Sequence, residues 1–290
     1  DTTIDSIAFH GARVPDHNGA GIRAEHPSGE LRVLRSGFYD NQNGLLSAAG
    51  PVRISIERSE FARSDTGTLA ALGHNLYIGR IDRLTVRSSF FHEAVRGHNL
   101  KSRAKVSVVE NSYFMDGPGG RSSYLTDFPD GGQVTLRGNL LHKGPLADNP
   151  TAVAFGAEST SAWPTNALEL SHNTLVMTRS GGYFLRAPAA TQSLRLTANV
   201  WAGTGSPSLL TGGYAPGNVV QTGNVSLQAA QFPGASQLAL PVFWPTAAAL
   251  SALALPGVPD AAYTHDSPRP YVRRAMAAGV RLAGALQSAP

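Results

Sequence analysis

Residues 86–91 and 109–114 are VRSSFF and VENSYF, two copies of one six-residue pattern. Each copy begins with a branched aliphatic residue, has Ser or Asn at its fourth position and has an apolar residue at its sixth. Further copies are VLRSGF (33–38), IERSEF (56–61), LRGNLL (136–141), LSHNTL (170–175) and LTANVW (196–201), with a weaker eighth copy at VQTGNV (220–225). Self-similarity of this kind indicates a repeat architecture.

The fourth positions of the seven clear copies are separated by 23 to 34 residues. This spacing suits one coil of a parallel β-solenoid, in which each turn pairs in register with its neighbours. Helical repeats fit poorly, because these segments are rich in Gly, Asn, Ser, Val and Thr. Stacked coils bring equivalent positions about 4.8 Å apart, so the Ser and Asn side chains can hydrogen-bond from coil to coil. The sequence therefore predicts an all-β, single-domain right-handed parallel β-helix of about 7–9 coils.

The chain ends differ in composition from the repeats. We expect the β-helix to cover residues 1–226, and residues 227–290, which are rich in Ala, Pro and Leu, to form a capping or packing extension. A solenoid needs such an element because uncovered terminal coils present open sheet edges. The spacing of apolar residues predicts a short helix near 271–286. Packing against the coils and binding a partner are both roles open to this helix.

The composition excludes several classes of function. The 290 residues contain no Cys, which rules out disulfides and thiolate metal sites and is compatible with an oxidising compartment. There is no apolar run of about 18 residues, so we expect no membrane insertion. The net charge of +4 would attract acidic polymers. Because the cations are scattered and no recognised nucleic-acid module is present, we expect no nucleic-acid partner. We also expect a monomeric protein.

Lysine is rare in this chain. Only three of the 24 basic residues are Lys, at positions 101, 105 and 143, all in mid-chain. Where Arg is the default cation, a Lys is expected at a site that needs an ammonium group able to lose its proton. Chance clustering of three residues is the alternative interpretation.

Alignment of three coils on their Ser/Asn positions predicts a patch of ionisable and aromatic side chains. We place Leu76, Leu100 and Leu125 in one inward column, so that their neighbours on both sides point outward. The outward set is Asn75, Asn99 and Tyr124 on one side and Tyr77, Lys101 and Thr126 on the other, with Arg103 also outward and with His74, His98, Arg96, Asp127 and Asp130 flanking them. The coils on either side lack this patch and offer little but Glu158. A stripe restricted to the middle coils is where a solenoid would hold an extended polymer.

Two members of the patch have structural interpretations. Strict alternation points His74 and His98 inward, where a hydrogen-bonded core histidine and a catalytic histidine are both reasonable. The segment DFPDGG (127–132) is typical of a turn first and of a site second.

The repeat, together with GAGIRAE (19–25) and FYDNQNGLL (38–46), resembles the pectate lyase-like right-handed parallel β-helix superfamily over about residues 20–225. That superfamily includes lyases, glycoside hydrolases, esterases, epimerases and adhesins, so the resemblance implies a fold more than a reaction. The stretch GHNLKSRAKVSVVENSYF (97–114) is similar to one in polysaccharide lyases of the chondroitinase B and alginate lyase type. There a lysine removes the substrate proton, which implies that role for Lys101.

The same resemblance has two departures. Those lyases carry Arg-His-Gly one coil later, where this chain has Leu125 to Pro129, and they bind calcium through acidic residues where this chain has His98 and Asn99. Calcium, held by Asp and backbone oxygens, therefore stays open as a cofactor, and no other cofactor is implied.

β-Elimination from a uronic acid needs a base, donors that neutralise the carboxylate, and an acid for the leaving oxygen. We expect Lys101 to be the base, with Arg103 nearby favouring its neutral form. The carboxylate would be held by Arg103, Asn75 and Asn99. Candidate acids are Tyr124, Tyr77 and His98, and the remaining substrate-binding candidates are His74, Asp127, Asp130 and Arg96.

The sequence thus predicts a secreted or periplasmic lyase that cleaves an acidic, uronate-containing polysaccharide. One alternative is a glycoside hydrolase, which needs two carboxyls about 5 to 9.5 Å apart and could draw them from Asp116, Asp127 and Asp130. A C5-epimerase would share the proton-abstraction step. A non-catalytic carbohydrate-binding adhesin is the third class, although binding stripes in solenoids extend over more coils than this patch does.

Overall fold

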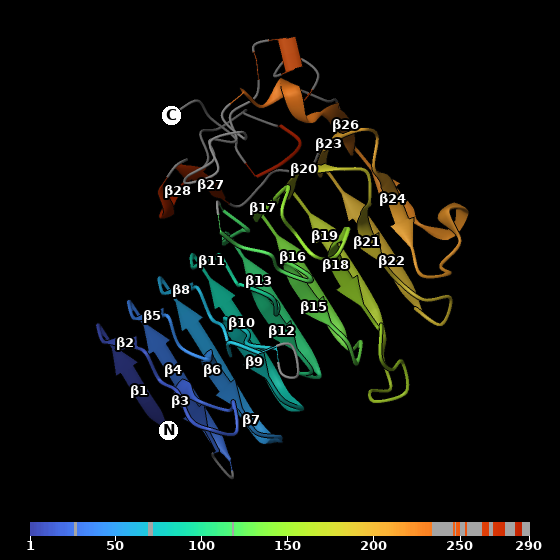
Figure 1. Cartoon of the computed structure of the whole chain (residues 1–290). Helices are drawn as coiled ribbons and strands as arrows, with labels where there is room; N and C mark the ends of the chain where they lie inside the picture. Colours follow the sequence, from blue (N-terminus) through green and yellow to red (C-terminus); the bar gives the residue numbers. More distant parts are fainter. Residues whose placement is uncertain are drawn as a thin grey trace.

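The computed structural model describes residues 1–25, 28–68, 72–117, 119–233, 246, 248–249, 253, 263–266, 269–275 and 282–285. Up to residue 228 the chain winds into a parallel β-helix, and each turn adds one short strand to each of three parallel sheets, called A, B and C in chain order (Figure 1). Sheets A and B have nine strands and sheet C has eight. The prediction of an all-β parallel β-helix with about 7–9 coils is confirmed.

The strand bounds follow the repeat. Sheet A contains β1 (Thr2–Asp5), β4 (Gly29–Leu34), β7 (Gly50–Glu57), β10 (Ile81–Arg87), β13 (Val106–Glu110), β16 (Gln133–Arg137), β19 (Ala167–Ser171), β22 (Ser193–Thr197) and β25 (Val220–Thr222). Sheet B contains β2 (Ala8–His10), β5 (Gly37–Tyr39), β8 (Glu60–Ala62), β11 (Phe90–His92), β14 (Tyr113–Met115), β17 (Leu140–Lys143), β20 (Thr174–Ser180), β23 (Val200–Thr204) and β26 (Val225–Gln228). Sheet C contains β3 (Ala20–Ala24), β6 (Asn43–Ser47), β9 (Leu76–Ile78), β12 (Leu100–Ser102), β15 (Thr126–Phe128), β18 (Thr151–Phe155), β21 (Tyr183–Arg186) and β24 (Ser208–Thr211).

The fourth residue of each repeat forms the bend between sheets A and B and links the coils in a ladder. The Ser59 hydroxyl accepts the backbone N–H of Ser36 at 3.1 Å, and the Asn199 amide oxygen accepts the N–H of Asn173 at 3.0 Å. Bonds of the same kind join every coil to the next, from Ile7 to Asn224. The structural role expected for this column is confirmed.

The third residue of each repeat has a positive φ. Seven of these nine residues are not Gly, as at Arg35 (φ 48°) and His172 (φ 53°). The left-handed conformation costs a non-Gly residue roughly 1 kcal/mol. It turns the chain sharply, and the ladder bond made by the next residue offsets this cost.

The ladder corrects the register of one copy and adds another. The acceptor for the Asn199 N–H is Asn224, so the last copy is QTGNVS (221–226), one residue later than the sequence pattern suggested. Residues 4–9, IDSIAF, form a first copy that escaped detection, because Ile7 replaces Ser or Asn at the fourth position and only donates to Ser36. An end coil needs no acceptor of its own.

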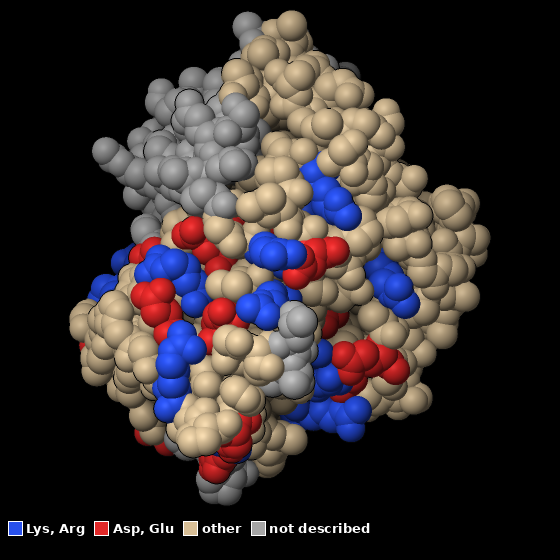
Figure 2. All heavy atoms as spheres, viewed as in Figure 1, with Lys and Arg blue, Asp and Glu red and all other residues tan. Residues whose placement is uncertain are grey.

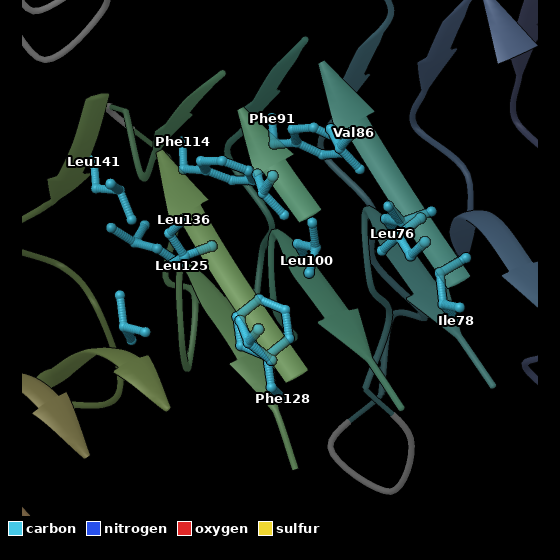
Figure 3. Packing of buried hydrophobic residues seen from close by; sticks show 14 of the residues in the cluster. Leu76, Ile78, Val86, Phe91, Leu100, Phe114, Leu125, Phe128, Leu136 and Leu141 are labelled. Atoms are coloured by element: carbon cyan, nitrogen blue, oxygen red, sulfur yellow. The ribbon is translucent and has the colours of Figure 1, made fainter. Parts of the chain in front are cut away.

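In every copy before the last, the first and sixth positions point into the helix and form its core. The sixth-position rings of Phe9, Phe38, Phe61, Phe91 and Phe114 stack in a row with centroids 4.3 to 5.0 Å apart. Figure 3 shows the continuation of this row at Leu141, facing Leu76, Leu100 and Leu125 of the sheet-C coils. Apolar residues in register on all three inner faces thus fill the interior.

The C-terminal extension packs along the outer face of sheet B. Its described residues Phe232, Leu253 and Ala285 belong to one apolar cluster with outer positions of β11, β14, β17, β20 and β23. The Gly284 N–H also bonds to the carbonyl of Ala198 at 2.7 Å. This contact explains why the outer face of sheet B is apolar in these coils.

The expected helix near 271–286 is not found over its first five residues. Residues 271–275 belong to β28 (Arg269–Ala275), which pairs antiparallel with β27 (Tyr263–Asp266). Residues 276–281 and 286 lie outside the described residues. Among the described residues up to 233, the helical elements are the short 3-10 turns η1 (Pro216–Asn218) and η2 (Ala229–Gln231). Within the described ranges, none of the helical segments has the length and apolar character that crossing a membrane requires.

Substitution of a ladder residue tests this account. Asn173→Ala removes the acceptor for the Asn139 N–H and the donors to the Leu136 carbonyl and to Asn199, all at a fully buried position. Because each buried polar group left without a partner costs about 1–3 kcal/mol, we expect the free energy of unfolding in urea to fall by about 2–4 kcal/mol. The matched control is Asn224→Ala at the half-buried end of the ladder, where the loss should be smaller. Equal losses at the two positions would contradict a buried, cooperative ladder.

Candidate active site on sheet C

The outer face of sheet C carries the predicted patch, in a register that differs by one residue in one coil. Lys101 pairs with Tyr77 on β9 and with Asp127 on β15, so these three side chains form one outward column. The sequence alignment placed Thr126 in that column. Thr126 instead pairs with Leu100 and is fully buried. Matching the coils on Leu identity caused this error, because Leu125 and Leu100 are not equivalent.

The two asparagines expected to face substrate are structural. Asn75 and Asn99 are fully buried at the corner before each strand, where two consecutive residues point inward and alternation fails. The Asn75 amide donates to the His92 carbonyl and to Asn99 Oδ1, both at 2.8 Å, and Asn99 Nδ2 donates to the Met115 carbonyl at 3.4 Å. Both side chains therefore form a second inter-coil ladder, and their expected role as carboxylate neutralisers is wrong.

His74, His98 and Tyr124 form a stack of rings at the same corner. The centroids of His74 and His98 are 4.8 Å apart, and those of His98 and Tyr124 are 5.1 Å apart. His74 Nδ1 accepts the His98 backbone N–H, and His98 Nδ1 accepts that of Tyr124. The proton of each neutral ring is therefore on Nε2. Both rings are buried, but they lie against side chains of the outward column, since the His74 ring contacts Tyr77 and His98 Nε2 is 3.4 Å from Asp127 Oδ2.

Burial keeps both imidazoles neutral. Burial, with the positive charges of Lys101 and Arg103, lowers the pKa of His74 to about 3. Burial, with His74 and Lys101 nearby, also lowers the pKa of His98 well below its usual value. A neutral His98 lacks the extra proton that a general acid needs at neutral pH, so the structure does not favour it as the acid.

Lys101 and Arg103 form the centre of a charged cluster. Lys101 Nζ lies 2.9 Å from Glu158 Oε1 and 5.6 Å from the centre of the Tyr77 ring. The Arg103 guanidinium donates to the Tyr77 hydroxyl at 3.1 Å, to Asp130 Oδ1 at 2.6 Å and to the second oxygen of Glu158. Arg80 adds a further bond to Asp130, at 2.7 Å. One carboxylate, that of Glu158, is therefore shared by Lys101 and Arg103.

Exposure within this cluster is uneven. The side chains of Lys101 and Arg103 are 11% and 18% exposed and that of Asp130 is 1% exposed, whereas that of Glu158 is 50% exposed. Although partial burial opposes the shift, the bonds from Arg103 and Lys101 lower the pKa of Glu158. In the view of Figure 2, charges of both signs are interspersed over the lower and central coils, and the coils at the upper right are mostly uncharged.

Asp127 is the most perturbed carboxyl of the site. Its Oδ2 lies 3.4 Å from His98 Nε2 and 3.8 Å from Lys101 Nζ, and its Oδ1 is buried without a hydrogen-bond partner among the described residues. Burial raises the pKa of Asp127 to about 7, against the positive charge of Lys101 and with the negative charge of Glu158 adding to the shift. A carboxyl that holds its proton to neutral pH can donate it to a substrate.

The other two lysines have different surroundings. Lys105 is exposed at the end of the turn into sheet A, just before β13. Lys143 is buried and donates to the carbonyls of Ser122 and Ser123 at 2.7 and 2.9 Å, with Asp116 Oδ2 3.8 Å away. Burial lowers the pKa of Lys143 to about 8 and raises that of Asp116. This pair fixes the segment before Tyr124 and lies apart from the charged cluster.

The remaining predicted residues are only partly brought together. Arg96 lies in the bend before β12, and among the described residues its side chain makes no recorded contact with the cluster. The segment 127–132 is both turn and site, since Pro129 and Asp130 form a turn while Asp127 and Asp130 join the cluster. The sequence analysis missed Arg80, Trp163 and the importance of Glu158. No local pattern marks them, because they reach the site from turns of unequal length.

The described residues offer little for a metal ion. Among them, no group of three or more His, Asp or Glu side chains is arranged to hold one, and Asp130 and Glu158 are already paired with cations. No step is therefore assigned to calcium.

In comparisons with known proteins, no family model, curated protein or solved structure matches the chain.

The environment of Asp127 predicts a pH dependence of stability. The unfolded chain releases this proton near pH 4, whereas the folded protein holds it to about pH 7, so stability falls as the pH rises between these values. Asp127→Asn cannot ionise and should lose this dependence. We expect the stability of the variant relative to the wild type to increase by up to about 4 kcal/mol between pH 4 and pH 8, measured by urea unfolding.

Asp82→Asn, at an exposed position of β10, controls for the substitution itself. A stability difference between Asp127→Asn and the wild type that does not change with pH would show that Asp127 is ionised throughout.

Proposed function

We propose that this protein cleaves an acidic, uronate-containing polysaccharide by β-elimination on the outer face of sheet C. The observation that supports this most directly is the shared carboxylate. Lys101 and Arg103 are held so that one carboxylate bonds to both, with Lys101 Nζ 2.9 Å from Glu158 Oε1. A uronate carboxylate has the same shape and charge as that of Glu158.

The shape of the site favours a polymer over a small molecule. Tyr77, Lys101 and Asp127 form a row across three consecutive coils, and neighbouring coils of a β-helix are about 4.8 Å apart. An extended chain lying along this row would meet aromatic, cationic and carboxyl groups in turn. Aromatic faces and charge-assisted donors are groups that bind sugar rings and their carboxylates.

The geometry suggests a role for each group. Arg103, fixed by Asp130 and Tyr77, would hold the substrate carboxylate and stabilise the enolate-like intermediate. That carboxylate would take the place of Glu158 between the two cations. Lys101 would then take the C5 proton as the C4–O bond breaks. Asp127 would give its proton to the leaving oxygen, and a C4–C5 double bond would remain in the sugar.

Glycoside hydrolysis is the second candidate, and one observation favours it. Two carboxyls flank Lys101 Nζ, Glu158 at 2.9 Å and Asp127 at 3.8 Å, and their pKa values are shifted in opposite directions. Such a pair is the pattern of a base and an acid in glycosidases. A C5-epimerase would use the same base without cleaving the chain, and an adhesin would only bind.

A panel of polymers separates these functions. Alginate, pectate, glucuronan, hyaluronan and chondroitin would each be incubated with the protein, with and without EDTA. We expect ultraviolet absorbance from an unsaturated uronate to rise with at least one of them. New reducing ends without absorbance would indicate a hydrolase and not a lyase. Inversion at C5 without cleavage would indicate an epimerase, and retention on a polysaccharide gel alone would indicate a binding protein.

Lys101→Ala tests the proposed base. Because Glu158 is half-exposed and Asp127 holds its proton near neutral pH, loss of Lys101 leaves no buried charge unpaired. We expect activity to fall by about 10²-fold or more while the melting temperature stays nearly unchanged. Lys105→Ala, which removes the same charge from an exposed position four residues away, should be as active as the wild type. A large fall in the melting temperature of Lys101→Ala would make this residue structural.

A further inference from the structure

Glu158 holds both cations of the proposed site, although it comes from a separate turn. We propose that the carboxylate of Glu158 occupies the place of the substrate's carboxylate, and that the need to displace it makes the site selective for sugars that carry a carboxylate. Glu158 is then a specificity-determining residue, outside the chemistry itself. The inference rests on the proposed function, because it concerns the same substrate class.

Both cations have contacts that do not involve Glu158. Arg103 keeps its bonds to Asp130 and to the Tyr77 hydroxyl, and its carbonyl accepts the indole N–H of Trp163 at 3.1 Å. Lys101 lies over the Tyr77 ring and near Asp127. Both cations are mostly buried, and the hydrogen bonds of Arg103 to Tyr77 and Asp130 set its position before any ligand arrives. A site with this degree of preorganisation binds a matching anion at low entropic cost.

Glu158, in contrast, can leave by rotation of its side chain alone. Its backbone N–H bonds to the Pro129 carbonyl at 3.0 Å, and the N–H of the next residue, Ser159, bonds to the same oxygen at 2.9 Å. Asn166 also donates to the Thr160 carbonyl at 2.7 Å, which holds the rest of the turn. The backbone is therefore anchored, while the carboxylate at the end of the side chain is half-exposed.

Charge explains why displacement would select among ligands. With Glu158 in place, the carboxylates of Asp130 and Glu158 face the cations Lys101, Arg103 and Arg80. A neutral sugar that pushed Glu158 aside would leave Lys101 and Arg103 without this counter-ion in a poorly solvated site. A uronate restores the lost contacts with its own carboxylate, so only an acidic sugar exchanges with Glu158 at little net cost.

Glu158→Gln tests this inference. The ligands are tetramers of each uronate polymer in the panel and the same tetramers after reduction of their carboxyl groups, and Kd is measured by titration calorimetry. We expect at least one uronate tetramer to bind the variant about three- to tenfold more tightly than it binds the wild type. The reduced, neutral tetramer should show no such gain. Glu169→Gln removes the same charge from the outer face of sheet A and should leave every Kd unchanged.

Several results would overturn the inference. One is a Kd of Glu158→Gln for the uronates that is unchanged or higher than that of the wild type, and another is an equal gain in affinity for the neutral tetramers. The others are no uronate binding by either protein, or a gain in affinity seen only with a sulfated polymer. Glu158→Ala, checked for an unchanged melting temperature, repeats the test if the glutamine variant is unstable.

The two proposals fail separately. Tighter uronate binding by Glu158→Gln without any ultraviolet product would keep the carboxylate site and reject the elimination. Elimination by the wild type with no gain from Glu158→Gln would keep the elimination and reject the displacement.

Discussion

After the first coil, each bend between sheets A and B combines one residue of positive φ with one side chain that hydrogen-bonds to the neighbouring coil, and the rest of the fold depends on this pair. The left-handed residue, such as Arg35 or Ala198, is unfavourable in isolation. The ladder bond that offsets it forms only when the coils are in register. A slip of one residue would both break the ladder and turn the stacked Phe side chains outward, so register is strongly specified.

This register allows turns of unequal length to build a site. The ladder fixes sheets A and B, and the turns before and after sheet C differ in length from coil to coil without disturbing it. The Arg103 side chain consequently bonds to side chains from three other coils, those of Tyr77, Asp130 and Glu158. Asn75 and Asn99 support the corner of sheet C from within, as a second ladder beneath the stacked rings of His74, His98 and Tyr124.

Burial gives this cluster its chemical character. Buried Asp130 holds Arg103 in position, whereas buried Asp127 has only a cation and a neutral imidazole nearby and keeps its proton to about neutral pH. The two buried carboxyls therefore differ in their partners: Asp130 is paired with Arg80 and Arg103, and Asp127 lacks such a pair. A buried carboxyl with incomplete hydrogen bonding, such as that of Asp127, is unfavourable for stability, and proteins retain such groups mainly at functional sites.

Sequence reasoning was most accurate where one pattern repeats and least accurate where the coils differ. The hexapeptides predicted the coils, the ladder and the core, and missed only the end copies, where Ile7 lacks the acceptor and Asn224 is displaced by one residue. On sheet C the prediction located Tyr77, Lys101 and Arg103 correctly. It misplaced Asn75 and Asn99, because alternation holds along a strand and fails at the corner where two successive residues point inward.

The sequence by itself determined the parallel β-helix. Its periodic pattern of apolar, left-handed and hydrogen-bonding positions specifies which residues are equivalent in successive coils, without knowledge of any contact. It also determined that a cationic and aromatic group lies on the middle coils. Only the tertiary structure decided which carboxyls meet that group, that Asp127 follows Lys101 in its column and that Glu158 bridges Lys101 and Arg103. These contacts join residues up to 57 positions apart through turns of irregular length, and no local pattern records where such turns return the chain.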